Sequence, residues 1–500
     1  MDSNRTALRV AKEPSFGVAP TNPLYQEIRR TSDGLAFTPT NEVTQEIEST
    51  RQVTDLINTG RDAAGDMAFE LSIENMDSFM EGMFCNPWLR TPEVKNGPAW
   101  EYGASATRIT ACTPTTVTLA ATSVLSGSQI NATGTSFLAN MLVSLSGFAN
   151  LNGLYKVSGS AATSITIAGG PTDAAPGTNA RVKVVGVEGA AADITAVISG
   201  GPALVTTALN WTTLGLIVGQ WVKISNEGGA YSFATVANNG YARISAITAT
   251  RLSFDATQGI FAADTGAGKT IRVYFGDTIR NGITQYTYRV EKEYTLAAGV
   301  RYSYFSGHQP SALTLTAETR GVVTGTQSWM GADATPPSAT RDVGAATLPI
   351  SNKTVLDASN SVPMIMEAGV VLGAPNYVSG FTFTFDNGLR ARNAIGSPGA
   401  IGLGMGRVNI TGTLTTYFGD EVLLNKLRAA QASGTTIAFR DAANLMGEIW
   451  DMPRLKYSSG FPEVPGIDTD LTTALGFQAL RDLAANRDYT IMLCRFDYLQ

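Results

Sequence analysis

The stretch Phe381-Thr382-Phe383-Thr384-Phe385 decides the fold class of this 500-residue chain. Its strict alternation places the phenylalanines on one face of an extended segment and the threonines on the other, which is the pattern of a strand buried on one side. The same period of two recurs at residues 67–71, 286–290 and 313–316. The sequence therefore predicts a mainly β protein built from half-buried strands.

Helical patterns are few and short. Residues 77–84 place apolar side chains at helical spacing behind Asp77, a residue type that can cap a helix N-terminus. Residues 420–427 repeat this pattern behind Asp420. We expect short helices at both positions, as minor elements between strands.

The chain carries 36 basic and 42 acidic residues, which gives a formal net charge of −6. Charged residues make up only 16% of it, against about 25% in an ordinary soluble domain. Because 44% of the residues are hydrophobic, the chain can build cores. A general nucleic-acid binder needs an excess of Lys and Arg to neutralise phosphates, so the acid excess argues against that class.

Cysteine usage and targeting signals indicate where the chain is made. Its three cysteines show no Cys-x-x-Cys spacing, which argues against a disulfide scaffold and a zinc finger. The first twenty residues carry Arg5, Arg9 and Lys12 without an apolar core, so we expect no signal peptide. No run of 18 apolar residues occurs, so we expect no membrane insertion and synthesis in a reducing cytoplasm.

The single histidine, His308, excludes mechanisms that need two histidines. Residues 306–310 have the Ser, Gly and Pro content of a turn, so we expect a loop histidine. Glu291 and Glu293 share one face of a predicted strand. A solvated surface explains them more simply than a glycosidase pair does.

Two glycine-rich stretches fall short of nucleotide-binding motifs. Residues 266–270 end like a phosphate loop, but residue 263 is Ala where that motif needs Gly, and a predicted strand follows instead of a helix. Residues 402–406 lack the third glycine of a dinucleotide fingerprint and precede a strand. We therefore predict no enzyme, no cofactor and no metal site.

An internal repeat occupies the middle of the chain. Residues 152–157 resemble residues 239–244, and each copy places Asn-Gly, a tight-turn signal, ahead of a predicted strand. We expect two tandem inserted β modules, at 104–186 and 187–276. The expected remainder is an N-terminal arm at 1–19, a discontinuous first domain at 20–100 and 277–335, and a second domain at 336–500.

A second repeat relates the two outer domains. The order of strand, long loop, strand and short helix begins once at Gly34 and again at Gly380. The expected loops are residues 49–64 and 388–406. This repeat suggests that the outer domain is duplicated within the chain.

Several stretches resemble the tail tube (major tail) proteins of long-tailed bacteriophages. The N-terminal resemblance lies in residues 30–35, 46–57 and 64–71, followed by Asp77-Ser78-Phe79-Met80. It continues in residues 280–282, 288–292, 321–325 and 383–389. The resemblance implies a tail-tube-type β-sandwich or barrel, here duplicated, with two inserted small β modules and short helices.

The family resemblance also implies a function and partners. Subunits of this kind close into rings that stack into the virion tail tube, the conduit for genome passage into the host. Three duplicated chains or six would make such a ring. The implied partners are further copies of the chain, the tape measure, terminator and distal tail proteins, and double-stranded DNA that passes without sequence-specific binding. Assembly is implied in the host cytoplasm.

Site residues follow from this implied role. An acidic channel repels DNA phosphates, and Glu70 and Glu318 face away from apolar strand neighbours, so they are candidates for the lumen or the outer solvent face. Long loops suit contacts between rings and subunits. The candidate contact residues are Arg51, Gln52, Asp55, Asp386, Asn387, Arg390 and Arg392.

Two other functions remain open on the sequence. A glycan-binding surface adhesin would explain the tandem β modules, although no export signal supports it. A carbohydrate-active enzyme would use a carboxylate pair such as Glu291 and Glu293. The modules could serve weak adhesion to the host surface or stabilise the tube.

Overall fold

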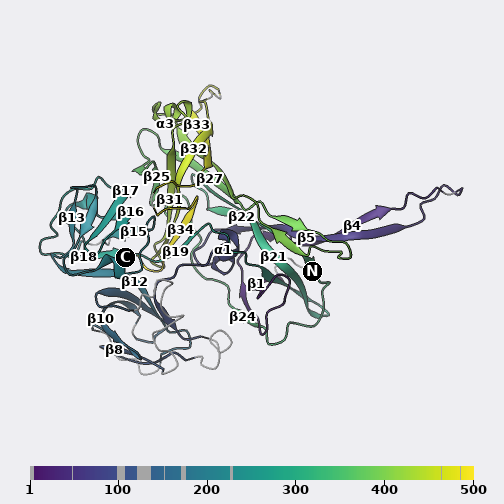
Figure 1. Cartoon of the computed structure of the whole chain (residues 1–500), viewed down its shortest axis with the longest axis horizontal. Helices are drawn as coiled ribbons and strands as arrows, with labels where there is room; N and C mark the ends of the chain where they lie inside the picture. Colours follow the sequence, from purple (N-terminus) through teal and green to yellow (C-terminus); the bar gives the residue numbers. More distant parts are fainter. Residues whose placement is uncertain are drawn as a thin grey trace.

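The computed structural model describes residues 5–47, 49–97, 107–120, 137–150, 152–169, 176–225, 229–462, 464, 466–484 and 486–499. About half of the structure is strand and only about a twentieth is helix, so the predicted mainly β fold is confirmed. Figure 1 shows a body of two joined halves, a second sheet packed to one side, and a long arm that projects away from both.

A sheet that we call the central sheet runs through both halves of the body. Its seven strands are all antiparallel to their neighbours. In spatial order they are β5 (Leu56–Glu70), β22 (Thr324–Gly331), β21 (Gly299–Glu318), β27 (Val378–Asp386), β30 (Asn409–Tyr417), β33 (Thr472–Ala479) and β32 (Met446–Ser459). We call β5, β22 and β21 the first half of this sheet and β27, β30, β33 and β32 the second half. The pairing of β21 with β27 joins the two halves.

Further strands and two helices form a second layer over the central sheet. In the first half these are β1 (Thr6–Lys12), β2 (Leu24–Glu27), β20 (Tyr288–Leu296), β23 (Asp333–Ala334), β24 (Ala346–Leu348) and α1 (Asp77–Phe84). In the second half these are β19 (Asp277–Arg280), β25 (Met364–Glu367), β26 (Val370–Val371), β31 (Ser433–Asp441), β34 (Met492–Phe496) and α3 (Val422–Arg428). The long strands β21 and β32 each bend from one layer into the other.

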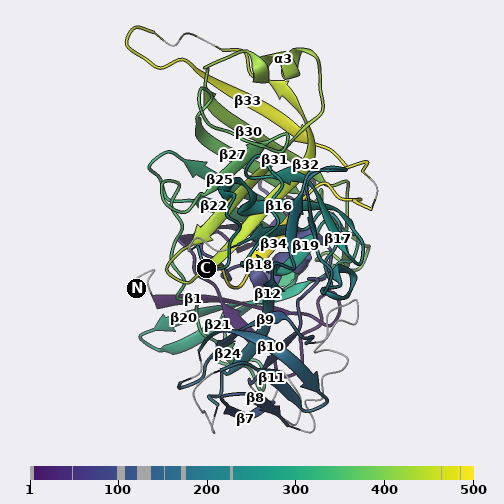
Figure 2. The ribbon, with the colours of Figure 1, turned by 90° about the vertical axis from the view of Figure 1, so that its left-hand side faces the viewer.

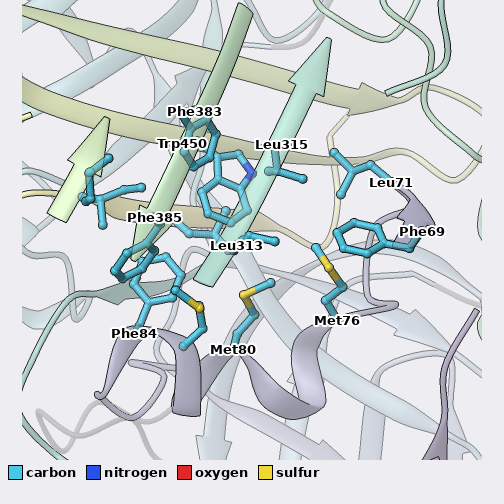
Figure 3. Close-up of a cluster of buried hydrophobic side chains, with 14 of the residues drawn as sticks. Phe69, Leu71, Met76, Met80, Phe84, Leu313, Leu315, Phe383, Phe385 and Trp450 are labelled. Atoms are coloured by element: carbon cyan, nitrogen blue, oxygen red, sulfur yellow. The ribbon is translucent and has the colours of Figure 1, made fainter. Parts of the chain in front are cut away.

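The core lies between the two layers, as Figure 3 shows for the part above α1. The alternation of residues 381–385 supplies part of it, since Phe381, Phe383 and Phe385 all point inward and are buried. Phe383 packs against Trp450 of β32 with ring centroids 5.5 Å apart, and Phe385 packs against Phe84 of α1 at 5.2 Å. Burial of these aromatic side chains supplies the main stabilising contribution of the fold.

The helix predicted at residues 77–84 is confirmed as α1, and the helix behind Asp420 as α3. The expected cap of α1 was wrong, because Met76 is the N-cap residue and makes no side-chain cap. Asp77 instead accepts a hydrogen bond from Arg495 Nη1 at 2.7 Å. Asp420 does accept a hydrogen bond from the Val422 amide at 3.0 Å.

The loop expected at residues 49–64 is shorter than predicted. β5 starts at Leu56 and pairs with β4 (Ala36–Val43) in a two-stranded hairpin, which we call the arm. The described residues of its tip are 44–47 and 49–55. β3 (Ser32–Asp33) extends β4 in the same register against β5. The loop at 388–406 holds a small hairpin of β28 (Arg390–Arg392) and β29 (Gly402–Gly404).

The middle of the chain forms one separate sheet, which we call the module sheet. Its order is β13 (Thr195–Val197), β14 (Ala203–Val205), β17 (Arg251–Thr257), β16 (Gly240–Ile247), β15 (Trp221–Ile224), β18 (Thr270–Tyr274), β12 (Arg181–Ala191), β9 (Met141–Ser146), β10 (Gly153–Ala161), β11 (Ser164–Ile167), β8 (Thr116–Leu119) and β7 (Ile109–Thr113), with β6 (Glu93–Lys95) on β12. Short 3₁₀ turns lie at η4 (Trp211–Thr213) and η5 (Val236–Asn238). Figure 2 shows β12 between β18 and β9. Because β12 runs across residue 186, both expected modules share this sheet, and their division stays a proposal.

The loop position expected for His308 was wrong. His308 lies within β21 and is fully buried, with Nδ1 3.1 Å from the Ser306 carbonyl oxygen. The turn-like composition of residues 306–310 reflects an irregularity inside the strand, where Gly307 adopts a φ of 66°. Burial lowers the pKa of His308 to about 4, so the ring is neutral in ordinary buffers.

Replacing Phe383 tests the core assignment. We expect Phe383→Ala to lower the free energy of unfolding by about 3–5 kcal/mol, because the side chain is buried against Trp450. Thr382→Ala, one residue away on the opposite face, should change it by less than about 1 kcal/mol. Urea denaturation of the two variants measures both values, and equal losses would contradict the assignment of the faces.

Candidate functional site

The face of the central sheet opposite the core carries mostly small polar side chains. Paired strands place these side chains in rows across both halves, so that Glu70, Thr324, Thr316, Thr382 and Thr413 form one row. We call this surface the open face. Its members on the six strands from β5 to β33 are Ala64, Asp66, Ala68, Glu70, Thr324, Thr326, Ser328, Met330, Ala312, Thr314, Thr316, Glu318, Gly380, Thr382, Thr384, Asp386, Asn409, Thr411, Thr413, Thr415, Tyr417, Thr472, Ala474, Gly476 and Gln478.

Threonine hydroxyls on the open face bond to one another across the junction of the two halves. Thr314 Oγ1 lies 2.9 Å from Thr384 Oγ1, and Thr382 Oγ1 donates to Thr316 Oγ1 at 3.3 Å. These contacts link threonines of β21 to threonines of β27 across the junction. Along this junction the open face therefore consists of short threonine side chains that are paired with one another.

Charge on the open face is one-sided. Glu70 and Glu318 are exposed there, and Asp66 and Asp386 lie together in another row of the same face. The described residues of these six strands place no Lys or Arg on this face. The first cation beside it is Lys456 of β32, which lies opposite Gln478.

The arm has two unlike faces. One continues the open face and carries Thr38 with Asp62 and Glu42 with Ile57 as opposed pairs. The other carries Phe37, Val43 and Leu56, all exposed. An apolar strand surface held away from the body is typical of an interaction site.

Three predicted contact residues lie at the tip of the arm. Arg51, Gln52 and Asp55 are exposed there, and Arg51 adopts a left-handed φ of 58°. Asp55 closes the tip, because its carbonyl oxygen accepts the Thr44 amide at 3.2 Å and its carboxylate accepts the Leu56 amide at 2.7 Å. The structure therefore presents this group at the far end of the arm.

The other four predicted contact residues divide into buried and exposed positions. Asn387 is only 2% exposed and donates from Nδ2 to the Met83 carbonyl oxygen at 2.7 Å, so its side chain holds α1 within the subunit. Asp386 accepts the Gly388 amide at 2.7 Å and lies on the open face. Arg390 and Arg392 are exposed on β28.

The structure brings the 388–406 loop against the base of the arm. The Arg61 amide of β5 donates to the Pro398 carbonyl oxygen at 2.8 Å. Arg390 and Arg392 therefore belong to the same end of the body as the arm, although Arg51 and its neighbours lie beyond them at the tip.

Glu291, one of the two carboxylates considered for a glycosidase, takes part in contacts within the subunit. Glu291, expected on a solvated face, is fully buried; its carboxylate accepts hydrogen bonds from Arg9, Arg341 and Tyr304. These contacts make Glu291 the centre of a structural ion cluster. Among the described residues, no group of three or more His, Cys, Asp or Glu side chains is placed to hold a metal ion. No helix in that part of the chain is long and apolar enough to cross a membrane.

Comparison with known families gives one match. The family model of the phage tail tube protein matches residues 3–220 and 225–479, which is most of the chain. The chain belongs to this family. A search of curated proteins found no match. The resemblance seen in the sequence is thus confirmed, and the chain is a structural component of the bacteriophage virion tail.

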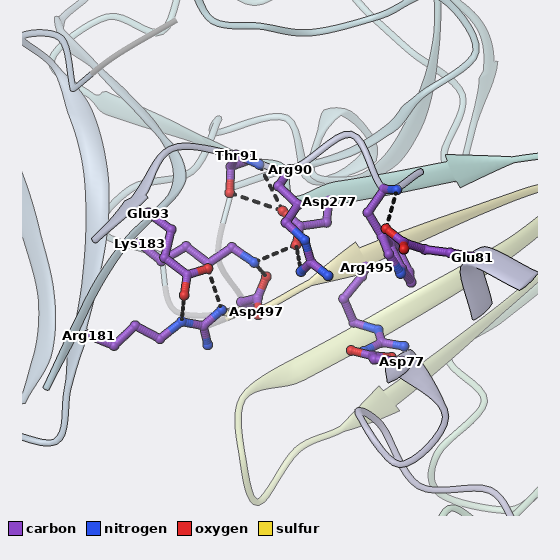
Figure 4. Close-up of polar contacts among 11 residues, drawn as sticks. Asp77, Glu81, Arg90, Thr91, Glu93, Arg181, Lys183, Asp277, Arg495 and Asp497 are labelled. Atoms are coloured by element: carbon purple, nitrogen blue, oxygen red, sulfur yellow. Dashed lines mark hydrogen bonds and ion pairs between the residues drawn. The ribbon is translucent and has the colours of Figure 1, made fainter. Parts of the chain in front are cut away.

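This tail tube protein holds its module sheet to the body through buried ion pairs, shown in Figure 4. Lys183 of β12 is 2% exposed in its side chain and binds Asp277 of β19 at 2.7 Å and also Asp497, which follows β34. Arg181 bridges Glu93 at 3.0 Å and Asp497 at 3.3 Å. The body and the module sheet therefore share the same carboxylates.

Charge overrides burial in this cluster. Burial alone would raise the pKa of Glu93, but the positive charges of Arg181 and Lys183 lower it to about 2. The same two cations lower the pKa of Asp497 against its own burial. Since an unfolded Glu has a pKa near 4.5, Glu93 stabilises the fold fully above that pH, and the contribution is lost as the pH falls towards 2.

Sequence reasoning missed this cluster, although a signal was present. Lys183 interrupts the apolar run of β12, where Val182, Val184 and Val185 are all buried. A lone lysine inside such a run needs a carboxylate partner when buried. The sequence could not say which of 42 acidic residues would supply it.

Removing the buried Lys183 should strongly lower the stability of the tail tube protein. We expect Lys183→Met to lower the free energy of unfolding by about 3–5 kcal/mol, because Asp277 and Asp497 are left without their cation. The matched control is Arg481→Met, which breaks the pair with Asp488 in which both side chains are 68% exposed, and should cost under about 1 kcal/mol. Thermal denaturation at pH 7 compares them; a small effect of Lys183→Met would contradict the proposed anchoring.

Proposed function

We propose that copies of this tail tube protein close head to tail into rings of three, and that the rings stack into a tube whose channel is lined by the open face. The genome would pass through this channel into the host. The observation that carries the proposal is the open face itself, which spans both halves, is rich in threonine, bears carboxylates and holds no cation on the described residues of its six strands.

A channel for DNA must guide the duplex without holding it. Lysines and arginines facing the channel would release counterions from DNA and bind it. Glu70, Glu318, Asp66 and Asp386 would repel the phosphates instead, once repeated around and along a tube. The threonine hydroxyls keep the surface wetted without adding charge.

The repeat within the body supports the proposed ring number. The two halves contain a matching pair of neighbouring strands in the central sheet, β5 with β22 in one half and β30 with β33 in the other. The first strand of each pair leads to the helix of its half. Three chains would therefore supply six similar units to a ring. Electron microscopy of the purified protein tests this directly, with hollow tubes of threefold symmetry as the expected result.

The arm is proposed to join successive rings. Its acidic face would extend the channel lining across the seam, while Phe37, Val43 and Leu56 pack on the neighbouring ring. Arg51, Gln52 and Asp55 at the tip, with Arg390 and Arg392 near the base, would contribute polar contacts. Such a contact between unlike surfaces generates a filament when repeated.

The remaining partners are those of a tail: the tape measure inside the tube, and terminator and distal tail proteins at its ends, with assembly in the host cytoplasm. The module sheet would decorate the outside. No specific observation on the described residues favours the alternative function of a glycan-binding adhesin. Isolated elongated particles in place of tubes, together with selective glycan binding, would favour it.

Reversing charge on the open face should impede the DNA. We expect virions with Glu70→Lys and Glu318→Lys in the tail to assemble but to eject their genome roughly tenfold more slowly, because the channel then attracts phosphates. Glu421→Lys, an exposed acid beside α3 and away from the open face, is the control. Ejection measured by release of a DNA-binding dye distinguishes them, and unchanged ejection in the double variant would refute the channel assignment.

Shortening the arm should separate ring formation from stacking. We expect deletion of residues 45–54 to leave folded subunits that form rings but few or no tubes, since β4 and β5 keep their paired register up to the cut. Negative-stain microscopy counts rings and tubes. Tubes at the normal yield would remove the proposed role of the tip.

A further inference from the structure

One contact inside the chain has no counterpart in the repeated half. In the first half, β20 pairs with β21, and β21 pairs with β22 and then with β27. In the second half, β31 pairs with β32, and β32 pairs with β33. Among the described residues, the strand that should follow on β32, as β27 follows on β21, is missing.

We propose that the missing strand is β3, with residues 34–36, of a second copy of this chain, which pairs antiparallel with the end of β32. This inference rests on the proposed assembly into rings and names the surfaces that close them. The junction of β21 with β27 is the template for it, because β3 pairs with β5 in the same antiparallel way as β27 pairs with β30.

The two helices fix the correspondence between the halves. Phe69 lies eight residues before the first residue of α1, and Leu414 lies eight residues before the first residue of α3. Both side chains are buried. Met67 then corresponds to Gly412. Their partners are Asp33 and Phe383, so Leu35 corresponds to Phe385 two residues further on.

The same comparison makes β32 of the second half the counterpart of β21 of the first half. Gln327 of β22 corresponds to Phe477 of β33, and their partners are Leu313 and Tyr457. Within the chain Leu313 lies opposite Phe385. Between copies, Tyr457 therefore lies opposite Leu35, and Lys456 lies opposite Ala36.

Backbone direction agrees with this register. The Leu480 amide bonds to the Arg454 carbonyl oxygen at 2.8 Å, so even-numbered residues of β32 turn their backbone groups to β33 and Tyr457 turns away from it. On the other strand the Gly34 amide bonds to the Asp66 carbonyl oxygen at 2.7 Å, which leaves Leu35 turned away from β5. Among the described strands, β3 pairs only with β5.

The burial of side chains and the placement of charges also agree with this register. Tyr457 is 5% exposed and Leu35 is 4% exposed, so both lie on the core side, as Leu313 and Phe385 do. Lys456 falls on the open face and would stand beside the next copy's Ala36, between that copy's Asp62 and Asp66. The cation that borders the open face is thus brought to acidic residues and neutralised there.

A disulfide tests the register. Lys456 and Ala36 would form a non-hydrogen-bonded pair with a short Cα separation, suitable for a disulfide. We expect tubes of the Lys456→Cys, Ala36→Cys double variant to lose their monomer band under mild oxidation, with a ladder on non-reducing gels that ends at three chains. The native cysteines 85, 112 and 494 are buried and stay in place.

Controls separate this junction from the assembly it serves. Each single variant should stay monomeric on the gel, and the pair Lys456→Cys with Thr38→Cys, one step out of register, should cross-link little. If tubes form but neither pair cross-links, or if the shifted pair cross-links equally, the junction is overturned while the tail tube role stands. If the wild-type chain forms no tubes at all, the proposed function fails instead.

A measurement on the unmodified protein covers the case in which the variants do not assemble. Hydrogen exchange on wild-type tubes and on free subunits should show loss of exchange at the amides of Leu35 and Tyr457 on assembly. Equal exchange in both forms would overturn the junction.

Discussion

The pairing of β21 with β27 is the interaction on which the rest of this molecule depends. It runs from Ala312 to Glu318 and joins two similar half-bodies into one antiparallel sheet. Because backbone hydrogen bonds leave little freedom in register, the rows of side chains on one half continue into the other. A single surface that spans both halves exists only through this junction.

The two faces of that sheet serve different ends. On the inner face, aromatic and aliphatic side chains meet α1 and Trp450, and their burial supplies most of the stability. On the open face, threonines and carboxylates form a polar and acidic surface. Alternation along each strand separates the two tasks residue by residue.

The module sheet is fastened by a mixture of apolar and ionic contacts. Trp221, Tyr241 and Tyr274 of that sheet pack with residues of β25 and β34 in a shared apolar cluster. Beside it, Lys183 and Arg181 share Asp497 with the body. Since buried charges are stabilising only when paired, the ionic contacts fix where the module sheet sits more than how tightly it is held.

Alternation and helical spacing are local properties of the chain, and they were enough to predict the mainly β class, both helices and the exposed carboxylates Glu70 and Glu318. The order of its motifs was enough to indicate the tail tube family. Contacts between distant segments were needed to show that Asn387 is buried under α1, that His308 lies in a strand, and that residues 56–64 belong to the arm. Those outcomes depend on partners distant along the chain, such as Met83 for Asn387 and β4 for β5. A local pattern states which side of a strand is apolar, but long-range pairing decides what covers it.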